Sequence, residues 1–216
     1  MADAALAPRV DRRSSQRRGT ATREDIGAAA LDLFARLGYH AASMRAIASA
    51  AGIQPAAIYH WYPSKEAILV YLQDDFMDRL VGKVEAAMAR EGRPALKLAA
   101  AVREHVVFHG LHTREAFVTD SEIRALRPDA RDRLIAQRDA YQDIFISATE
   151  EGVADGSLRV ANPRIAMYST LLACTGVGLW FDPEGSLALE EVADLQVELV
   201  LLSLGGGPEL IAEAMR

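Results

Sequence analysis

Apolar residues recur at helical spacing along most of the chain from residue 22 onward. The first helix is expected to begin at a capping box formed by Thr22 and Asp25 and to end at Gly38. Its apolar face consists of Ile26, Ala30, Leu33, Phe34 and Leu37. After residue 65 the same period predicts helices over 65–90, 94–112, 115–126, 130–151, 164–181 and 187–204. Their stops are rich in glycine and proline, the last being Gly205 to Gly207. The pattern therefore predicts an all-α protein.

Residues 43–65, SMRAIASAAGIQPAAIYHWYPSK, predict two short helices joined by a tight turn. Gly52 supplies the left-handed backbone that such a turn requires, and Pro55 suits the first turn of the second helix. The apolar positions of this segment are Ile47, Ala48, Ala51, Ile53 as a buried plug, and Ile58. This is the pattern of a helix-turn-helix, whose second helix enters the major groove of DNA.

The charge is distributed unevenly between the two ends of the chain. Residues 1–65 carry nine basic and five acidic side chains, whereas the remainder carries 15 basic and 25 acidic ones. A positive module on a negative body favours binding of nucleic acid at one end only. We divide the chain into an arm at 1–21, a DNA-binding domain at 22–65 and a helical effector-binding and dimerisation domain at 66–216. The arm, basic through Arg9, Arg12, Arg13, Arg17 and Arg18, is expected to be disordered without DNA. It either follows a minor groove or phosphates in the complex, or is a solvated tail without a role.

The motifs LFARLGYHAASMRAIASAAGI and AAIYHWYPSKEAIL resemble the DNA-binding domain of the TetR/AcrR transcriptional regulators. The resemblance is dense over the N-terminal third of the chain and looser beyond it. The chain departs from the family at Trp61 and Tyr62, and at Gln54 with the following Pro55. These departures concern the operator sequence and leave the expected fold unchanged.

The resemblance implies a set of DNA contacts. Ser43 caps the second helix beside a phosphate and Arg45 contacts the backbone. Gln54 either reads an adenine or caps the recognition helix, while the methyl groups of Ala56 and Ala57 contact thymine methyls. Tyr59 matches the family's phosphate-binding tyrosine. The remaining implied contacts are His60 to a base or phosphate and Lys65 to a phosphate, whereas Trp61 and Tyr62 are expected to pack the helix junction.

A second resemblance lies in EIRAL, RDAYQDIF, GVADGSLR and LWFDPEGSLALEEVADL. These motifs are similar to a TetR subgroup that controls fatty-acid or steroid-ring breakdown and responds to acyl-CoA thioesters. The candidate effector residues are Phe108, Phe117, Tyr141, Phe145, Trp180 and Phe181 for the chain, and Arg124, Arg133 and Arg138 for the anionic head. The alternatives are that the aromatic residues are core and that Arg138 forms structural ion pairs with Asp139 or Glu122. A free lipophilic drug-like molecule or a metal ion is the alternative effector.

His105, His109 and His112 fall on one helical face. Such spacing can hold zinc or copper, but no cysteine lies near in sequence, so we favour histidines that line a polar pocket and expect no metal or cofactor. The last two apolar helices, TLLACTGVGLW and VADLQVELVLLSL, predict a four-helix homodimer interface, with close approach at Gly176 and Gly178.

Other classes of function find little support. The chain has no nucleotide-binding loop, nucleophile elbow, H-E-x-x-H or C-x-x-C motif, so we expect no enzyme. The acidic body argues against a DNA-compacting protein. No apolar run reaches the length of a membrane span, no signal peptide is expected, and the single Cys174 suits a reducing compartment. We therefore expect a cytoplasmic repressor, on the nucleoid when bound to DNA, that binds a palindromic operator as a dimer and leaves it when an effector binds. Activation in place of repression remains open.

Overall fold

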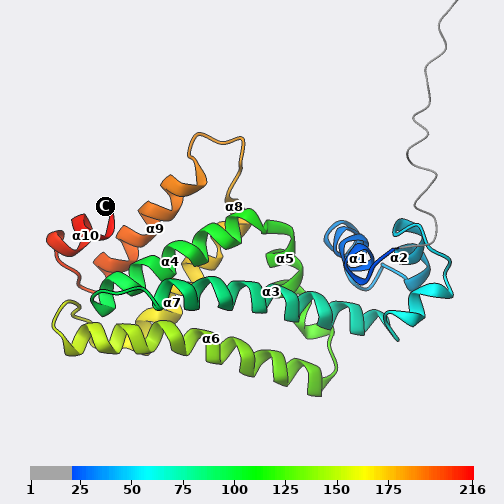
Figure 1. Cartoon of the computed structure of the whole chain (residues 1–216), viewed down its shortest axis with the longest axis horizontal. Coiled ribbons are helices and arrows are strands. Elements are labelled where there is room, and N and C mark those ends of the chain that lie inside the picture. Colours follow the sequence, from blue (N-terminus) through cyan, green and yellow to red (C-terminus); the bar gives the residue numbers. More distant parts are fainter. Residues whose placement is uncertain (1–20) are drawn as a thin grey trace, which may run out of the picture. The chain divides into compact units, whose positions relative to one another are not determined.

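The computed structural model describes residues 21–216, in which the regular elements are all helices (Figure 1). Contacts divide the chain into two units, one ending at Ile68 and the other beginning at Leu69. The predicted domain boundary at residue 65 lies close to this division. The predicted N-terminal arm, apart from Ala21, lies outside the described residues.

The first unit contains three helical segments and the beginning of a fourth. They are α1 (Arg23–Leu37), α2 (Met44–Ala50), the 3₁₀ helix η2 (Ala57–His60) and α3 (Lys65–Met88). The predicted capping box is present, since the Asp25 amide donates to Thr22 Oγ1 at 3.2 Å and the Thr22 amide donates to Asp25 Oδ2 at 2.9 Å. Gly52 has φ +73°, as the turn after α2 requires. The buried core includes Ile26, Ala30, Phe34, Ile47, Ala48, Ile58 and Tyr62.

The segment after Gly52 is shorter and less buried than the sequence predicts. Instead of a regular second helix, a turn at residues 55–56 leads into η2, whose first bond runs from the Ala57 amide to the Gln54 carbonyl at 2.9 Å. Pro55 and Pro63 bracket this segment, and neither can donate a backbone hydrogen bond, so an α-helix has little room to propagate. Ile53, the expected plug, is only half-buried, and Leu37 is 57% exposed.

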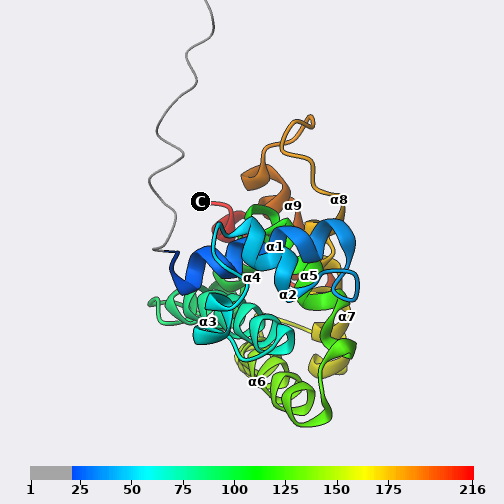
Figure 2. The same ribbon diagram turned by 90° about the vertical axis from the view of Figure 1, so that its right-hand side faces the viewer.

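The second unit is a bundle around α4. Its helices are the remainder of α3, α4 (Pro94–Leu111), α5 (Thr113–Ser121), η3 (Ile123–Ala125), α6 (Pro128–Ala154), α7 (Pro163–Thr175), α8 (Val177–Trp180), α9 (Leu189–Ser203) and α10 (Pro208–Ala214). α4 packs against α6, α7, α8, α9 and α10. α3 and α6 run side by side, joined by a bidentate ion pair from Arg133 to Asp74 at 2.8 and 3.1 Å (Figures 1 and 2). No helix within residues 21–216 is both long and apolar enough to cross a membrane.

Two features near the C-terminus differ from the prediction. The helix expected over 164–181 breaks at Gly176 into α7 and α8, and α10 follows the three glycines, where no helix was expected. Gly205, at φ +72°, ends the preceding helix and lets the chain reverse, so that the Gly206 amide donates to the Leu201 carbonyl at 2.8 Å. Gly178 does permit a close approach, but within one protomer: a Cβ there would lie 3.3 Å from the His109 carbonyl oxygen on α4.

Candidate DNA-binding and effector sites

The predicted DNA contacts lie on α2, on η2, in the turn between them and, for Lys65, at the start of α3. The Ser43 hydroxyl accepts a hydrogen bond from the Ala46 amide at 3.2 Å and so caps α2. Tyr59 is 57% exposed, whereas its neighbour Ile58 is fully buried. Ser43, Arg45, Gln54, Ala56, Tyr59 and His60 are exposed, and Ala57 and Lys65 are half-buried. The fold therefore leaves most of these side chains available to a ligand while the apolar residues between them hold the unit together.

Trp61 and Tyr62 behave differently from each other. Tyr62 is buried, its hydroxyl donates to the Arg23 carbonyl at 3.2 Å, and it packs the junction as predicted. Trp61 is 46% exposed beside His60, so its predicted place in the core is wrong. The reason is that the chain leaves η2 with an α-type bond from the Tyr62 amide to the Ile58 carbonyl at 3.0 Å, so Ile58 and Tyr62, four residues apart, share the inner face and Trp61 points outward. Trp61 is thus an additional exposed aromatic side chain next to the candidate DNA contacts.

Lys65 has a structural task that the sequence did not reveal. Its ammonium group donates to the carbonyl oxygens of Tyr39 at 2.6 Å, Ala42 at 2.8 Å and His40 at 3.3 Å. The same Nζ lies 4.3 Å from the centre of the Tyr39 ring. These acceptors match the three hydrogens of an ammonium group, so the side chain ties the loop before α2 to the start of α3. A direct phosphate contact from Lys65 would compete with these bonds.

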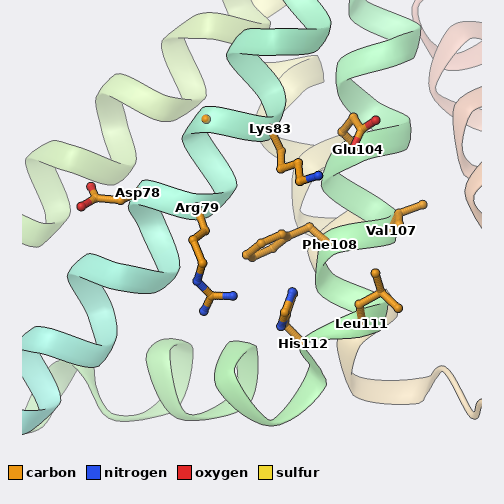
Figure 3. Close-up of a pocket in the computed structure, with 9 residues that line it drawn as sticks. Asp78, Arg79, Lys83, Glu104, Val107, Phe108, Leu111 and His112 are labelled. Atoms are coloured by element: carbon orange, nitrogen blue, oxygen red, sulfur yellow. The ribbon is translucent and has the colours of Figure 1, made fainter. Parts of the chain in front are cut away.

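A pocket of about 490 Å³ lies in the second unit between α3 and α4 (Figure 3). Val107, Phe108 and Leu111 form its apolar wall on α4, and Arg79 and Lys83 extend from successive turns of α3. Its full lining is Asp78, Arg79, Gly82, Lys83, Glu104, Val107, Phe108, Leu111 and His112. The pocket thus joins an apolar surface to an edge with two cations, Arg79 and Lys83, and two carboxylates, Asp78 and Glu104. The apolar wall and the two cations are the groups that an amphipathic anion would use.

The two cations of the pocket differ in their partners. Arg79 Nε lies 2.8 Å from Asp75 Oδ2, and its Nη2 pairs closely with Glu115 Oε2 on α5. Burial opposes the charge on Arg79, but these carboxylates outweigh it and raise the pKa of the guanidinium. Lys83 is exposed and makes no ion pair with any described residue. Asp78 points away from the Phe108 ring, whereas Arg79 and Lys83 extend toward two sides of it; Glu104, also in the lining, lies on the Lys83 side (Figure 3).

Comparison with known proteins identifies the family. Residues 26–72 match the family model described as bacterial regulatory proteins, tetR family. Residues 91–204, more than half of the chain, match the one described as tetracyclin repressor-like, C-terminal domain. The chain belongs to the TetR family. The resemblance predicted from the sequence is confirmed, and so is the all-α fold with its N-terminal helix-turn-helix domain.

Among TetR-family relatives, the chain is 28% identical over 183 residues to the HTH-type transcriptional repressor KstR2 of Mycolicibacterium smegmatis, covering 83% of this chain and 88% of the relative. A tetR-family regulatory protein from Rhodococcus RHA1 superposes with a TM-score of 0.81 at 25% identity, covering 86% and 97% of the two chains. AibR, solved in complex with isovaleryl coenzyme A and operator DNA, superposes with a TM-score of 0.77 at 24% identity, covering 86% and 99%. At that identity the likeness to AibR is one of fold.

Few of the effector residues predicted for this TetR-family chain meet at the pocket. Phe108 lines it, but Tyr141 and Phe145 are buried in the core instead. Arg138 donates to the Thr119 carbonyl at 2.9 Å and lies 3.2 Å from Asp120, so it forms a structural ion pair, with a partner other than the two expected. The remaining candidates lie away from the pocket: Phe117 is 46% and Trp180 57% exposed, Arg124 is exposed, Phe181 is half-buried, and Arg133 pairs with Asp74.

Arg79 and Lys83, the cations of the pocket, were not predicted from the sequence. They stand four residues apart on α3 and therefore share one helical face, which was the available signal. In the sequence such a pair is indistinguishable from the solvated face of an amphipathic helix, because the facing helix α4 is known only from the fold.

Two of the three histidines, His105 and His109, form a polar centre in the bundle. His105 Nδ1 lies 2.7 Å from the Tyr141 hydroxyl and its Nε2 lies 3.1 Å from Thr175 Oγ1, while His109 Nδ1 donates to the His105 carbonyl at 2.9 Å. His112 lies apart, 3.5 Å from Glu115 Oε1. Within residues 21–216 no cluster of histidine, cysteine, aspartate and glutamate is arranged to hold a metal ion. The prediction that the histidines line a polar pocket therefore holds for His112 and is wrong for His105 and His109, which are buried and bonded to groups of the protein itself.

Burial governs the ionisation of this centre. It lowers the pKa of His105 well below its usual value and also lowers the pKa of His109. It raises the pKa of Tyr141, and it raises that of the neighbouring Cys174 thiol to about 12. All four groups are thus neutral in the folded protein at neutral pH.

Acidification is expected to destabilise the fold through these histidines. Because their pKa values are lowered on folding, the unfolded chain binds protons first, so the stabilisation is complete above about pH 6.5 and is lost as pH falls below it. The free energy of unfolding should fall by up to about 1.4 kcal/mol per buried histidine for each pH unit below 6.5. Urea denaturation between pH 7.5 and 5.0 measures this, with His105→Gln as the comparison. The His105→Gln protein should be less stable than wild type at pH 7.5, but its free energy of unfolding should fall less on acidification. If the free energies of unfolding of the two proteins fall in parallel with pH, His105 is not a source of the acid sensitivity.

Proposed function

We propose that this TetR-type transcriptional repressor binds a palindromic operator as a homodimer and is released from it by an amphipathic anion, best matched by an acyl-CoA thioester. The pocket between α3 and α4 carries the effector assignment. Its apolar wall at Val107, Phe108 and Leu111 suits an acyl chain, and its edge at Arg79 and Lys83 suits a phosphate-bearing head. In AibR the same fold is found with isovaleryl coenzyme A and operator DNA together.

The DNA-binding part of the proposal rests on the exposed side chains of α2 and η2. Two copies of this unit, related by a two-fold axis, would contact successive major grooves. Gln54 and Ala56 are exposed at the beginning of the second segment and are assigned to base edges, and the exposed Arg45 and Tyr59 are assigned to phosphates.

The dimer is supported by an exposed apolar stripe on α7 and α9. Leu172 on α7 is 74% exposed and Leu199 on α9 is 58% exposed, which is unusual for such large apolar side chains on neighbouring helices. The stripe consists of Ile165, Tyr168 and Leu172 on α7 and of Leu195, Leu199 and Leu202 on α9. A second copy of the same surface would cover it and form a four-helix interface.

Coupling between effector and DNA would pass through α3. Its first residues, Lys65 to Ile68, belong to the first unit, and the rest of the helix belongs to the second and lines the pocket. An effector that binds the DNA-incompetent arrangement more tightly shifts the population toward it and lowers operator affinity.

The proposal is tested by fluorescence anisotropy with labelled DNA from the promoter beside the protein's own gene. Acyl-CoA thioesters of increasing chain length are added to the complex, with free coenzyme A and the free acids as controls. Release by a thioester but by neither control supports the proposal. If the protein binds DNA tightly and no thioester releases it, the acyl-CoA assignment is wrong, and free lipophilic molecules are tested next. Absence of DNA binding would contradict the operator assignment.

Tyr59→Phe should weaken operator binding about tenfold, because a hydrogen bond to a charged phosphate contributes about 1.5 kcal/mol or more. A phosphate contact carries no base information, so the loss should be similar for the operator and for a variant operator with one altered base pair. Anisotropy titrations on both duplexes measure this. A loss confined to one of them would show that Tyr59 reads sequence.

A further inference from the structure

Arg79 lies where the pocket and α5 meet. Its guanidinium stands 5.4 Å from the centre of the Phe108 ring, inside the pocket lining. Its Nη2 nevertheless pairs with Glu115, which belongs to α5 and is not part of that lining. The side chains of Arg79 and Glu115 are 38% and 26% exposed, so both are within reach of a solute that enters from solvent.

Each edge of Arg79 that could bind a new anion already lies beside a carboxylate. A guanidinium binds a phosphate or carboxylate best through two parallel N–H groups on one edge. Asp75 takes Nε, at the Nε–Nη2 edge, and Glu115 takes one of the two N–H groups of Nη2. An anion at the remaining Nη1–Nη2 edge would therefore lie beside the Glu115 carboxylate, and the repulsion between the two negative charges favours displacement of Glu115.

Lys83 gives an incoming anion an advantage over Glu115. It stands one helical turn from Arg79, extends toward the other side of the Phe108 ring, and makes no ion pair with a described residue (Figure 3). An anion between the two side chains would neutralise both cations, whereas Glu115, held on α5 and also 3.5 Å from His112, engages only Arg79 of the pair.

Given the assignment of this pocket to the effector, we propose that Arg79 exchanges partners on binding. Without effector it pairs with Glu115 of α5, and with effector it binds the anionic group of that molecule together with Lys83. Glu115 is then a competitor for the site, and its release removes one bond between α5 and α3, while the Gln73 side chain of α3 still donates to the Thr119 carbonyl of α5 at 2.9 Å.

The exchange is tested by isothermal titration calorimetry of the full-length protein with coenzyme A, inorganic pyrophosphate and octanoate as separate probes. Glu115→Gln keeps the size of the side chain and removes the competing charge, so it should bind the preferred probe roughly three- to tenfold more tightly than wild type. Lys83→Gln should bind it more weakly by a similar factor. A gain with pyrophosphate and coenzyme A indicates a phosphate site, and a gain with octanoate alone indicates a carboxylate site.

Asp74→Asn is the matched control. It changes the net charge by the same amount and breaks a comparable pair between helices, with Arg133 of α6, outside the pocket. Its affinity for each probe should equal that of wild type. Equal gains in both variants, no gain in Glu115→Gln, or no binding of any probe would overturn the exchange.

If Glu115→Gln gains affinity but no thioester releases operator DNA, the exchange stands and the thioester assignment falls. If thioesters release the DNA but Glu115→Gln gains no affinity, the thioester assignment stands and the exchange falls.

Discussion

Replacing Leu172 with glutamate is expected to convert the protein into monomers and to abolish operator binding. Leu172 is 74% exposed in the single chain and stands in the apolar stripe of α7 and α9, which the proposed dimer covers. A carboxylate buried there without a partner costs about 3 kcal/mol or more, which raises the dimer dissociation constant more than a hundredfold. Sedimentation velocity measures the oligomeric state, and anisotropy with the operator measures the loss of binding.

Ile135→Glu is the control for this substitution. Ile135 on α6 is also a large exposed apolar residue, at 43%, but it lies outside the stripe. Its replacement should leave both the oligomeric state and the operator affinity unchanged. A Leu172→Glu protein that sediments as wild type would show that the stripe on α7 and α9 is not where the copies meet.

Lys65→Met is expected to lower the stability of the DNA-binding unit by about 2 kcal/mol, a typical value for loss of charged hydrogen bonds. The methionine keeps the apolar stem but leaves the carbonyl groups of Tyr39, His40 and Ala42 without their donor. This loop leads directly into Ser43, the cap of α2, so operator affinity should fall as well. Urea denaturation and operator titrations at several salt concentrations measure the two effects.

The salt dependence decides how Lys65 acts. If Lys65 acts by holding the loop, operator affinity and stability both fall in the Lys65→Met protein. The slope of the logarithm of the operator association constant against the logarithm of the salt concentration then stays that of wild type. Loss of a direct phosphate contact would instead reduce that slope by about one. A reduced slope with unchanged stability would contradict the structural role and restore the phosphate contact predicted from the sequence.

The helix-turn-helix could be predicted from the sequence because its signals are local. The capping box of Thr22 and Asp25 and the left-handed Gly52 depend only on residues a few positions away, and both are present in the structure. The turn before η2 was harder to predict, because Pro55 is equally compatible with the first turn of a helix and with a segment too short to become one.

The effector pocket could not be predicted in the same way. Its wall and its cations come from α4 and α3, and only their packing brings Phe108 beside Arg79 and Lys83. The aromatic residues chosen from the sequence share helical spacing with core residues, and Phe145 proved to be core. Periodicity identifies which side chains point inward, but it does not distinguish those that fill the interior from those that border a cavity.

Cys174 makes the folded protein a convenient object for chemical labelling. It is the single cysteine, it is fully buried on α7, and its Sγ lies 3.9 Å from Gln196 Oε1 on α9. With its pKa raised to about 12, almost none of this thiol is present as the reactive thiolate. A maleimide or disulfide reagent therefore modifies Cys174 only when α7 and α9 separate, and its rate reports how often the native bundle opens. A cysteine introduced on η2 or α5 can accordingly be labelled selectively with a dye while the native thiol stays in place.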